Sequence, residues 1–441
     1  MSITRDTLVK LLSNLGSKKE VEQYLRHYCG VDSQRFAVIK IGGSVLFDQL
    51  DTVAASIAFL RQVGLTPLVV HGPGARLDPA LAEAGLSTPR RGAMRQISAA
   101  ALDVVRRVTQ SENLALVDAL DRHGCDSRPI TSGVFEAEPL GAEEYGLVGT
   151  VTSIDDAPVA AALKTGKLPV LTSLATTKGG QLLYVNADIA ARALAKRYQP
   201  NKVILLTPAG GLIDDKGEVV SAVNLAEDYD TLMSQPWLDA SARMRLEQIH
   251  GMLSELPAES SVSITAPDHL ARELFTHRGA GTLVRRGERV ACFESFEALD
   301  RARLQQLLES CFGRSLKPGY FDEKNFFRVY LTEDYRATAI LTREAGLPYL
   351  DKFGVTSKGQ GEGLGSSIWA RMRRDNQKLF WRSQTVNEVN SWYFQQSDGS
   401  YRTQKWTVFW YGMQSFEEIE RCVRTALALP ASLKDHGVAS D

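Results

Sequence analysis

Two glycine-rich segments in this sequence contain the residue types that bind phosphate groups. The first, VIKIGGSVL at residues 38–46, carries Lys40 in an apolar run that ends in a glycine pair. The second, QGEGLG, lies within YLDKFGVTSKGQGEGLGSSIWARMRRD at residues 349–375. Glycines let successive backbone N–H groups converge on a pyrophosphate at the positive end of a helix. Each segment is therefore a candidate phosphate site.

The second segment also predicts the elements that support it. A strand is expected to end at Val355, and an amphipathic helix is expected from about 363 to 374. The loop fits Q-x-x-G-x-G, has no GK[ST] and does not fit a plain GxGxxG fingerprint. Such a loop alone is a weak signal, which the flanking strand and helix strengthen. Its candidate cofactor-binding residues are Gln360, Gly361, Gly363, Gly365 and Ser366.

The composition indicates a globular protein of several domains. The 441 residues exceed what one core usually supports, and 44% are hydrophobic and 23% charged. A net charge of −1 suggests neither a nucleic-acid nor a membrane partner, and the sequence shows no secretory h-region and no long apolar span. The five cysteines are scattered and form no CxxC pair, which predicts reduced thiols in a cytoplasmic protein. The seven histidines lack metal-ligand spacing, so no metal site is expected.

The hydrophobic pattern divides the chain into three parts. Residues 1–35 are expected to form a helical arm, either a surface helix pair on the next domain or a contact with another subunit. From 36 to 290, buried runs such as FAVIKI, TPLVVH, LPVLTS, KVILLT and SVSITA alternate with amphipathic helices, which predicts a mainly parallel sheet between helices. Residues 291–441 have an α+β pattern, with strands expected at FFRVYLT, ATAILT, PYLDKFGV, KLFWRS and KWTVFWY.

Several motifs of the last part occur together in one known family. QGEGLG resembles the acetyl-CoA loop of the GNAT acetyltransferases, and YLDKF, LFWRSQTVN, SWYF, SDGS and KWTVFWYG resemble N-acetylglutamate synthases of the vertebrate type and their bifunctional synthase/kinase relatives. The resemblance runs from about residue 5 to the end. It implies an amino acid kinase fold followed by a GNAT domain, and acetyl transfer from acetyl-CoA to the α-amine of L-glutamate in arginine biosynthesis.

The resemblance assigns roles at the acetyl-transfer site. It implies that Lys352, Arg382 and Asn387 bind glutamate, and that Tyr393 and Lys352 are catalytic. A surface ion pair is the alternative for Arg382, and core packing is the alternative for Tyr393. The general base stays open between a relayed water, Glu388 and Asp351. The main chain of Phe353, Gly354 and Val355 is expected to hold the acetyl carbonyl and the pantetheine arm.

The kinase-like part keeps some of the residues that the family uses and lacks others. Lys40, Gly42, Gly43, Gly72, Arg95, Asn186 and Asp188 match the family's phosphate and substrate residues. Four positions depart from it: Pro73 has no N–H to donate, Tyr184 replaces an asparagine, Pro208 replaces a glycine or aspartate, and Arg245 stands where a lysine is expected. These departures predict a degenerate kinase that serves regulation and assembly, with ATP and magnesium used only if it is active.

The family resemblance also implies an effector and an assembly. L-Arginine is expected to bind near Glu273, Gly279 and Gly281, for which the alternative is a helix end and a strand turn. A homo-oligomer is expected, with a tetramer favoured. Two other functions stay open: a bifunctional synthase/kinase with an active kinase, and a non-catalytic arginine-sensing protein.

Overall fold

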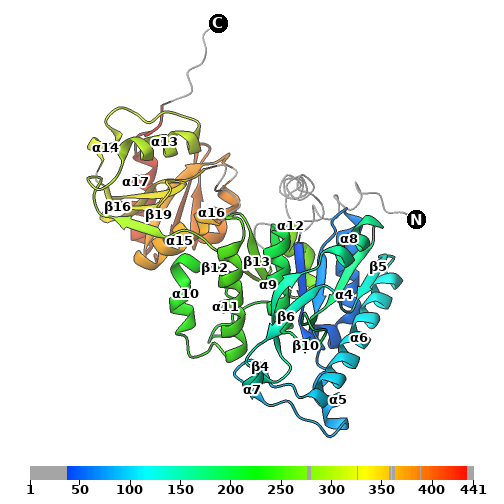
Figure 1. Cartoon of the computed structure of the whole chain (residues 1–441). Coiled ribbons are helices and arrows are strands. Elements are labelled where there is room, and N and C mark those ends of the chain that lie inside the picture. The colour runs from blue at the N-terminus through cyan, green and yellow to red at the C-terminus, as the bar shows by residue number, and fades with distance from the viewer. Residues whose placement is uncertain are drawn as a thin grey trace. The chain divides into compact units, whose positions relative to one another are not determined.

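The computed structural model describes residues 37–275, 280–324, 326–356, 359, 363–387 and 389–434 (Figure 1). The chain divides into two compact units, unit 1 up to Arg286 and unit 2 from Gly287 onward. The predicted helical arm at 1–35 lies outside the described residues.

Unit 1 is built on an eight-stranded sheet in the order β12-β14-β13-β11-β1-β2-β8-β5. Neighbouring strands run parallel except β13 and β14, so the predicted mainly parallel sheet is confirmed. Every residue of β1, β11 and β13 is buried, as expected for strands covered on both faces. The strands are β1 Ala37–Ile41, β2 Leu68–His71, β5 Ser127–Ile130, β8 Leu168–Thr172, β11 Lys202–Leu206, β12 Ala222–Asn224, β13 Ser261–Thr265 and β14 Thr282–Arg285.

Helices cover both faces of this sheet. Ile39 of β1 packs in one cluster with α4 and α6, while the preceding Val38 packs in a second cluster with α9 and α11. Side chains of a strand alternate between faces, so each cluster marks one face. The helices are α3 Gly43–Asp48, α4 Leu50–Gln62, α5 Leu77–Glu83, α6 Ala99–Arg122, α7 Ala142–Tyr145, α8 Ala157–Lys164, α9 Ala187–Tyr198, α10 Leu225–Met233, α11 Ala240–Glu255, the 3-10 turn η2 Pro267–His269 and α12 Leu270–Phe275.

The sequence analysis did not predict two further pairings in unit 1. A four-stranded sheet has the order β10-β9-β6-β7, and β3 pairs with β4 as a short hairpin. These strands are short and partly exposed, so they lack the long buried apolar runs that identify the main sheet. They are β3 Arg90–Arg91, β4 Met94–Arg95, β6 Phe135–Pro139, β7 Gly149–Ile154, β9 Leu174–Thr176 and β10 Leu182–Tyr184.

Unit 2 has a seven-stranded sheet in the order β15-β16-β17-β18-β19-β21-β20. All its pairings are antiparallel except β18 with β19. The predicted strands and the predicted helix after the glycine loop are confirmed. The strands are β15 Val290–Phe293, β16 Phe326–Thr332, β17 Ala337–Glu344, β18 Leu347–Val355, β19 Leu379–Gln384, β20 Gly399–Arg402 and β21 Trp406–Tyr411, and the helices are α13 Arg301–Phe312, α14 Tyr320–Glu323, α15 Leu364–Asp375, α16 Asn390–Gln396 and α17 Phe416–Ala428.

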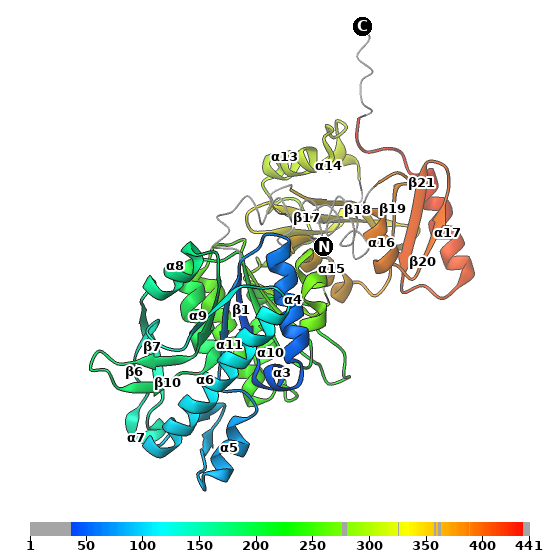
Figure 2. The same ribbon diagram turned by 90° about the vertical axis from the view of Figure 1, so that its right-hand side faces the viewer.

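The helices of unit 2 fall on opposite faces of its sheet. Residues of α15 and α16 pack in one cluster with Trp381 of β19, and α17 packs in another with the neighbouring Phe380. Helices α13 and α14 pack in a third cluster with Leu331 and Ile340, whose strand neighbours belong to the α15 side. Figure 2 shows α13 and α14 above the sheet and α15 below it. The sheet of unit 2 therefore has an α13/α14/α17 face and an α15/α16 face.

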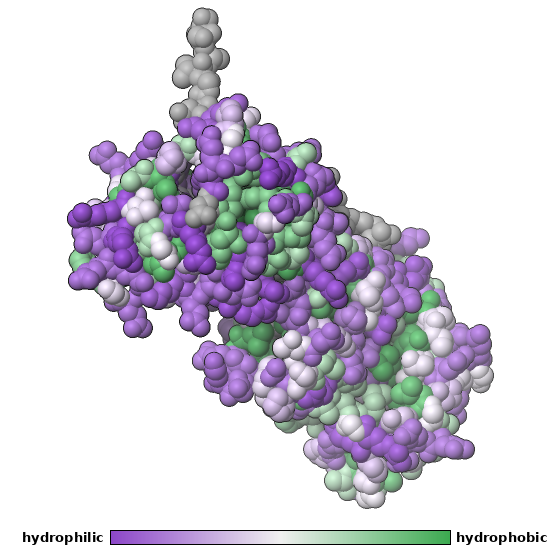
Figure 3. Space-filling model, turned by 90° about the vertical axis from the view of Figure 1, so that its left-hand side faces the viewer, coloured by the Kyte–Doolittle hydropathy of each residue, from purple (hydrophilic) through white to green (hydrophobic). Residues whose placement is uncertain are grey.

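The surface in Figure 3 carries more hydrophilic than apolar residues, with apolar areas between them. Within the residues that the structure describes, no helix is both long enough and apolar enough to cross a membrane. Four of the cysteines fall in the described ranges and carry free thiols.

Candidate functional site

Strands β18 and β19 separate from each other in the middle of the unit 2 sheet. They pair only at Tyr349 with Phe380 and Leu350 with Trp381, and β18 then continues to Val355 without β19 beside it. The register of β18 against β17 also shifts at Asp351, which forms a β-bulge. Beyond Leu350, β19 no longer pairs with this edge of β18. An extended chain can pair with such an edge.

Helix α15 begins beside this edge. Gly363 is its N-cap with φ +82°, a left-handed conformation that favours glycine, and no side chain among the described residues caps the helix. Its first N–H groups have no partner within the helix. A β-carbon on Gly365 would lie 3.2 Å from Cγ2 of Val355, so the glycine lets the helix start approach β18 closely. Ser366 is exposed, and Gln360 and Gly361 lie outside the described residues.

Lys352 lies in a buried network of charges on the α13/α14/α17 face. Its ammonium is 2.7 Å from Oδ2 of Asp351 and 5.1 Å from the ring centre of Tyr320. Asp351 also accepts a 2.7 Å hydrogen bond from the Tyr320 hydroxyl and pairs with Lys324. Burial lowers the pKa of Lys352, and Asp351 opposes that effect.

The same network decides against Asp351 as the general base. Burial acts to raise the pKa of this carboxyl, but the charges of Lys352 and Lys324 outweigh burial and hold the pKa well below its usual range. A carboxylate with such a low pKa is a poor proton acceptor at neutral pH. Glu388, the other named candidate, lies outside the described residues.

Arg382 is held by main-chain oxygens on the same face of the sheet. Its guanidinium donates to the carbonyl of Ala426 at 2.6 Å and to the carbonyl of Pro430 at 3.0 Å, and it lies 4.2 Å from the ring centre of Trp406. Ala426 is in the last turn of α17, where a cation is favoured by the helix dipole. The arginine is therefore fixed by the protein rather than by the surface ion pair considered from the sequence.

Tyr393 lies on the α15/α16 face. Its ring packs against Trp369, Trp381 and Phe409 and is 6% exposed. Burial raises the pKa of its phenol, which therefore stays protonated at neutral pH. Among the described residues the hydroxyl has no hydrogen-bond partner. The packing considered as an alternative is thus real, and it leaves the O–H free to donate.

Asn387 is tied to the segment between β19 and α16. Its amide donates to Oγ of Ser383 at 3.0 Å, and its Oδ1 accepts from the N–H of Val389 at 3.2 Å. The structure thus brings Lys352 and Arg382 to one face of the sheet and Tyr393 to the other. Lys352 and Arg382 lie just beyond the last paired residues of β18 and β19, where the two strands separate.

Unit 1 has its own buried cationic cluster at the carboxyl ends of its strands. Nζ of Lys40 in β1 is 2.9 Å from Oδ1 of Asp188 in α9, and both side chains are buried. Asn186 caps α9 by accepting from the N–H of Asp188 at 2.8 Å. Burial acts to raise the pKa of Asp188, but Lys40 and Arg245 together lower it. Arg245 makes no hydrogen bond to the part of the chain that the structure describes, and its Nε is buried.

The glycine turns of unit 1 pack against each other beside this cluster. A β-carbon on Gly43 would lie 2.9 Å from Cα of Gly74, and one on Gly42 would lie 2.7 Å from the carbonyl oxygen of Leu206. Gly72 has no such restriction, with its nearest neighbours at 3.5 and 3.6 Å. The VIKIGGSVL turn therefore needs its glycines for packing.

A buried histidine supports the glycine turn that follows β2. His71 is fully buried, its Nδ1 lies 2.8 Å from the carbonyl oxygen of Gly72, and its Nε2 lies 2.9 Å from Nδ2 of Asn113. Burial lowers its pKa to about 4, so the ring is neutral, donates from Nδ1 and accepts at Nε2. Asn113 also donates to the carbonyl of Val170 at 3.1 Å. The sequence analysis missed this pair because the two residues are separated by 42 positions.

The other residues named in unit 1 have local partners. Arg95 binds Asp78 through two hydrogen bonds of 2.6 and 2.9 Å and also donates to Thr88. Tyr184 is buried in β10, and burial raises its pKa while the nearby Arg95 opposes that effect. Pro208 is exposed just after β11.

Only part of the expected arginine site can be described. Glu273 is buried and accepts from the N–H of Ala280 at 2.9 Å and from the N–H of Gly281 at 3.2 Å. A β-carbon on Gly281 would lie 2.1 Å from the carbonyl oxygen of Ile264. Gly279 lies outside the described residues. The described contacts fit the helix end and strand turn considered as the alternative.

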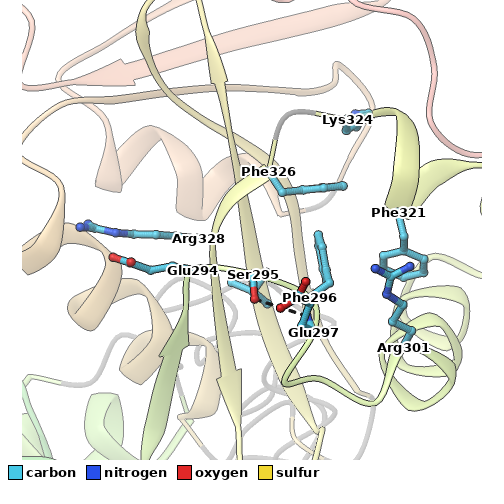
Figure 4. A pocket seen from close by; sticks show the side chains of 10 residues that line it. Glu294, Ser295, Phe296, Glu297, Arg301, Phe321, Lys324, Phe326 and Arg328 are labelled. Carbon is cyan, nitrogen blue, oxygen red and sulfur yellow. Dashed lines mark hydrogen bonds between the residues drawn. The ribbon is translucent and has the colours of Figure 1, made fainter.

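A pocket of about 280 Å³ lies elsewhere in unit 2. Figure 4 shows three phenylalanine rings among charged side chains in its wall. Several of these charges already have partners, since Lys324 pairs with Asp351 and Arg301 pairs with Asp322. None of the residues predicted for acetyl transfer lines this pocket. We therefore place the candidate site at the separation of β18 and β19.

Comparison with known proteins gives matches to both units. Residues 35–246 match the model described as amino acid kinase family, and residues 291–428 match the model described as NAT, N-acetyltransferase, of N-acetylglutamate synthase. An acetylglutamate kinase of Xanthomonas campestris is 49% identical over 93% of this chain and 97% of that protein. The human mitochondrial N-acetylglutamate synthase is 35% identical over 92% of this chain and 74% of that protein.

A solved structure also resembles most of the chain. The N-acetylglutamate synthase from Neisseria gonorrhoeae complexed with coenzyme A and N-acetyl-glutamate aligns with a TM-score of 0.62 over 90% of this chain and 98% of that chain. The sequence identity is 18%, so this likeness concerns the fold.

Proposed function

Because this chain belongs to the family that joins an amino acid kinase unit to the N-acetyltransferase unit of N-acetylglutamate synthase, we propose that it transfers the acetyl group of acetyl-CoA to the α-amine of L-glutamate. The observation that carries the proposal is the separation of β18 and β19 beside the start of α15, which no described side chain caps. The edge of β18 from which β19 diverges suits the amide-containing pantetheine arm, and the N–H groups of α15 suit the pyrophosphate.

The reaction needs no covalent enzyme intermediate. The α-ammonium first loses one proton to the base, and the resulting amine attacks the thioester carbonyl carbon to form the C–N bond. The nitrogen loses a second proton as the C–S bond breaks. The departing thiolate takes up one of these two protons, and the other is released to solvent. Tyr393 is the proposed donor near the sulfur or the oxyanion, because its side chain is buried, its phenol is protonated and its hydroxyl bonds to none of the described residues. A water relay is the proposed base, since Asp351 is a poor acceptor.

Lys352 and Arg382 are the proposed positive groups that attract the carboxylates of glutamate. Arg382 uses two of its N–H groups on Ala426 and Pro430 and keeps others for a ligand. Phe353, Gly354 and Val355 would hold the acetyl carbonyl and the pantetheine arm by strand-like pairing. Asn387 is retained as a glutamate contact at the end of β19.

A direct assay tests this function. Purified protein with acetyl-CoA should release CoA when L-glutamate is added and much less when no acceptor is added. D-Glutamate is the matched control, since it carries the same charges in the wrong configuration. CoA release that does not depend on L-glutamate would refute the assignment of the acceptor.

A second candidate function is phosphorylation of N-acetylglutamate by unit 1. The Lys40–Asp188 pair with Arg245 beside it favours this function, because clustered cations stabilise a transferring phosphoryl group. The relatives from Xanthomonas campestris and Xylella fastidiosa named acetylglutamate kinase support it too. The degenerate kinase expected from Pro73, Tyr184, Pro208 and Arg245 stays a prediction. ADP formation from ATP, magnesium and N-acetylglutamate decides between the two.

Three further proposals concern regulation, assembly and location. L-Arginine is proposed as an effector at unit 1, supported by a Neisseria gonorrhoeae N-acetylglutamate synthase structure described with coenzyme A and L-arginine. A homotetramer is proposed from the family resemblance alone. A cytoplasmic location is proposed because the described cysteines carry free thiols, as expected in a reducing compartment.

A further inference from the structure

The segment after α17 crosses unit 2 and pairs with the segment between α13 and α14. We name residues 429–434 the C-terminal strap. Leu433 forms an antiparallel bridge with Leu316, Lys317 donates its N–H to the carbonyl of Ser432 at 3.1 Å, and the N–H of Lys434 donates to the carbonyl of Ser315 at 3.0 Å. Leu433 packs in the α13/α14 cluster, and Leu429 packs in the α17 cluster. The strap is therefore fixed at both ends.

Both basic side chains proposed for glutamate binding are bonded to this strap or to the helix turn before it. Nζ of Lys352 donates to Oγ of Ser432, and the Arg382 guanidinium donates to the carbonyls of Ala426 and Pro430. The strap thus connects β18 to β19 at the point where the two strands separate. No sequence motif suggested this, because Ser432 is 80 positions from Lys352.

The hydroxyl of Ser432 completes the coordination of the Lys352 ammonium. The other N–H groups of that ammonium point to Oδ2 of Asp351 at 2.7 Å and to the Asp351 carbonyl at 3.1 Å. Among the described residues, the other acceptors of this ammonium both lie on Asp351, so Ser432 is its acceptor from outside β18. The O–H of Ser432 has no acceptor of its own within the described ranges, so it can donate to a carboxylate.

We infer that Ser432 is a positioning residue of the acceptor site, which fixes the Lys352 ammonium as a positive charge beside a carboxylate of the amino-acid substrate and offers that carboxylate its own O–H. This inference rests on the proposed acetyl transfer to L-glutamate. It assigns the strap to acceptor recognition and gives it no part in acetyl-CoA binding, because its bonded partners lie on the face opposite α15.

The test compares the kinetic constants of full-length variants. Ser432→Ala should raise the KM for L-glutamate about tenfold, as expected for the loss of one hydrogen bond to a charged group, with the KM for acetyl-CoA within about twofold. Ser432→Thr keeps the hydroxyl and should restore the KM for L-glutamate to within about threefold. Ser310→Ala is the matched control, because Oγ of Ser310 belongs to a partly buried serine hydroxyl of the same unit that donates to the carbonyl of Leu307 in its own helix and bonds to neither Lys352 nor Arg382. It should change neither constant.

Two truncations extend the comparison beyond one side chain. Ending the chain after Leu429 removes the Pro430 carbonyl and Ser432 together and should raise the KM for L-glutamate at least as much as Ser432→Ala. Ending it after Lys434 keeps the whole strap and should leave the KM unchanged. Equal losses for both substrates, or a lowered melting temperature without a selective change in KM, would show that the strap only maintains the fold.

The possible failures are distinguishable. An unchanged KM for L-glutamate in Ser432→Ala, in an enzyme whose wild type releases CoA with L-glutamate, overturns the role of Ser432 and leaves the proposed function standing. A wild type that releases no CoA with L-glutamate overturns the proposed function itself, and the inference with it.

Discussion

Removing the hydroxyl of Tyr393 should separate catalysis from stability. Tyr393→Phe keeps the ring, and therefore its contacts with Trp369, Trp381 and Phe409. Because the hydroxyl bonds to no described residue, its removal should change the melting temperature by less than about 2 °C. If it donates to charge that develops in the transition state, kcat should fall by about 10²–10³, the range for removal of one such donor.

Tyr411 provides the matched control within the same aromatic cluster. Its hydroxyl donates to the carbonyl of Asn376 at 3.0 Å, and the ring lies near Trp369 and Trp381. Tyr411→Phe leaves that buried carbonyl without its partner, which should destabilise unit 2 by about 1–2 kcal/mol and lower the melting temperature by a few degrees. It should leave kcat within about twofold, the opposite of the result expected for Tyr393→Phe.

The assay is CoA release at saturating acetyl-CoA and L-glutamate, with thermal unfolding measured on the same samples. Burial raises the pKa of Tyr393, so kcat should show no loss from deprotonation of this phenol between pH 6 and 9. A kcat for Tyr393→Phe within about threefold of the wild type would remove Tyr393 from the chemistry. Equal losses of kcat in the two variants would show that the cluster acts only through packing.

Three other changes test the remaining sites. Asp351→Asn should lower the free energy of unfolding of unit 2, measured in urea, by about 3–5 kcal/mol, because Lys352 and Lys324 lose their buried counter-charge. In the wild type, the stabilisation from Asp351 should persist through mild acid. Its carboxyl pKa is lowered in the folded state, so this stabilisation is present above the unfolded pKa and is lost only as the pH falls through the folded pKa. An unfolding free energy within about 1 kcal/mol of the wild type would contradict this. Gly365→Val should raise the KM for acetyl-CoA more than tenfold, because a side chain at this position meets Val355, and it should leave the KM for L-glutamate nearly unchanged. An equal rise in the KM values of both substrates would show a general distortion of unit 2. The pKa of His71 is lowered to about 4 in the folded state, so the stability that depends on its neutral ring is fully present above the unfolded pKa of about 6.5. This contribution, on the order of 3 kcal/mol, is lost as the pH falls to about 4. His71→Gln should remove that pH dependence of the unfolding free energy, and a dependence that persists would assign it to other groups.

The elements that carry the sites were predictable where a local pattern encodes them. Fully buried runs around Lys40 and at residues 261–265 identified the parallel sheet, and the strand–glycine loop–helix order around Val355 identified α15. These signals depend on neighbours in sequence, which share a strand or a helix face. The short strands β9 and β10 gave no such signal.

The contacts that decide each role could not be predicted, because they join distant positions. The β-bulge at Asp351 follows from the register of β18 against β17, which no spacing in the sequence specifies. Arg382 has the residue type for carboxylate binding, yet its main partners are carbonyls of residues 426 and 430. Ser432 carries no motif, and its role follows only from the path of the strap back across unit 2.

In unit 1, the four sequence departures argue against kinase activity, whereas the arrangement of the charged residues favours phosphate binding. Arg245 keeps the positive charge of the expected lysine, and together with Lys40 it lowers the pKa of the buried Asp188. The electrostatic requirement for holding phosphate is therefore retained. The requirement for directed donors is not, since Pro73 has no N–H and an arginine presents its donors in a wider fork than an ammonium. Attraction depends weakly on donor direction and transition-state stabilisation depends on it strongly. Nucleotide binding should therefore survive the four departures better than turnover does, and kcat for ADP formation is the quantity in which their effect will be largest.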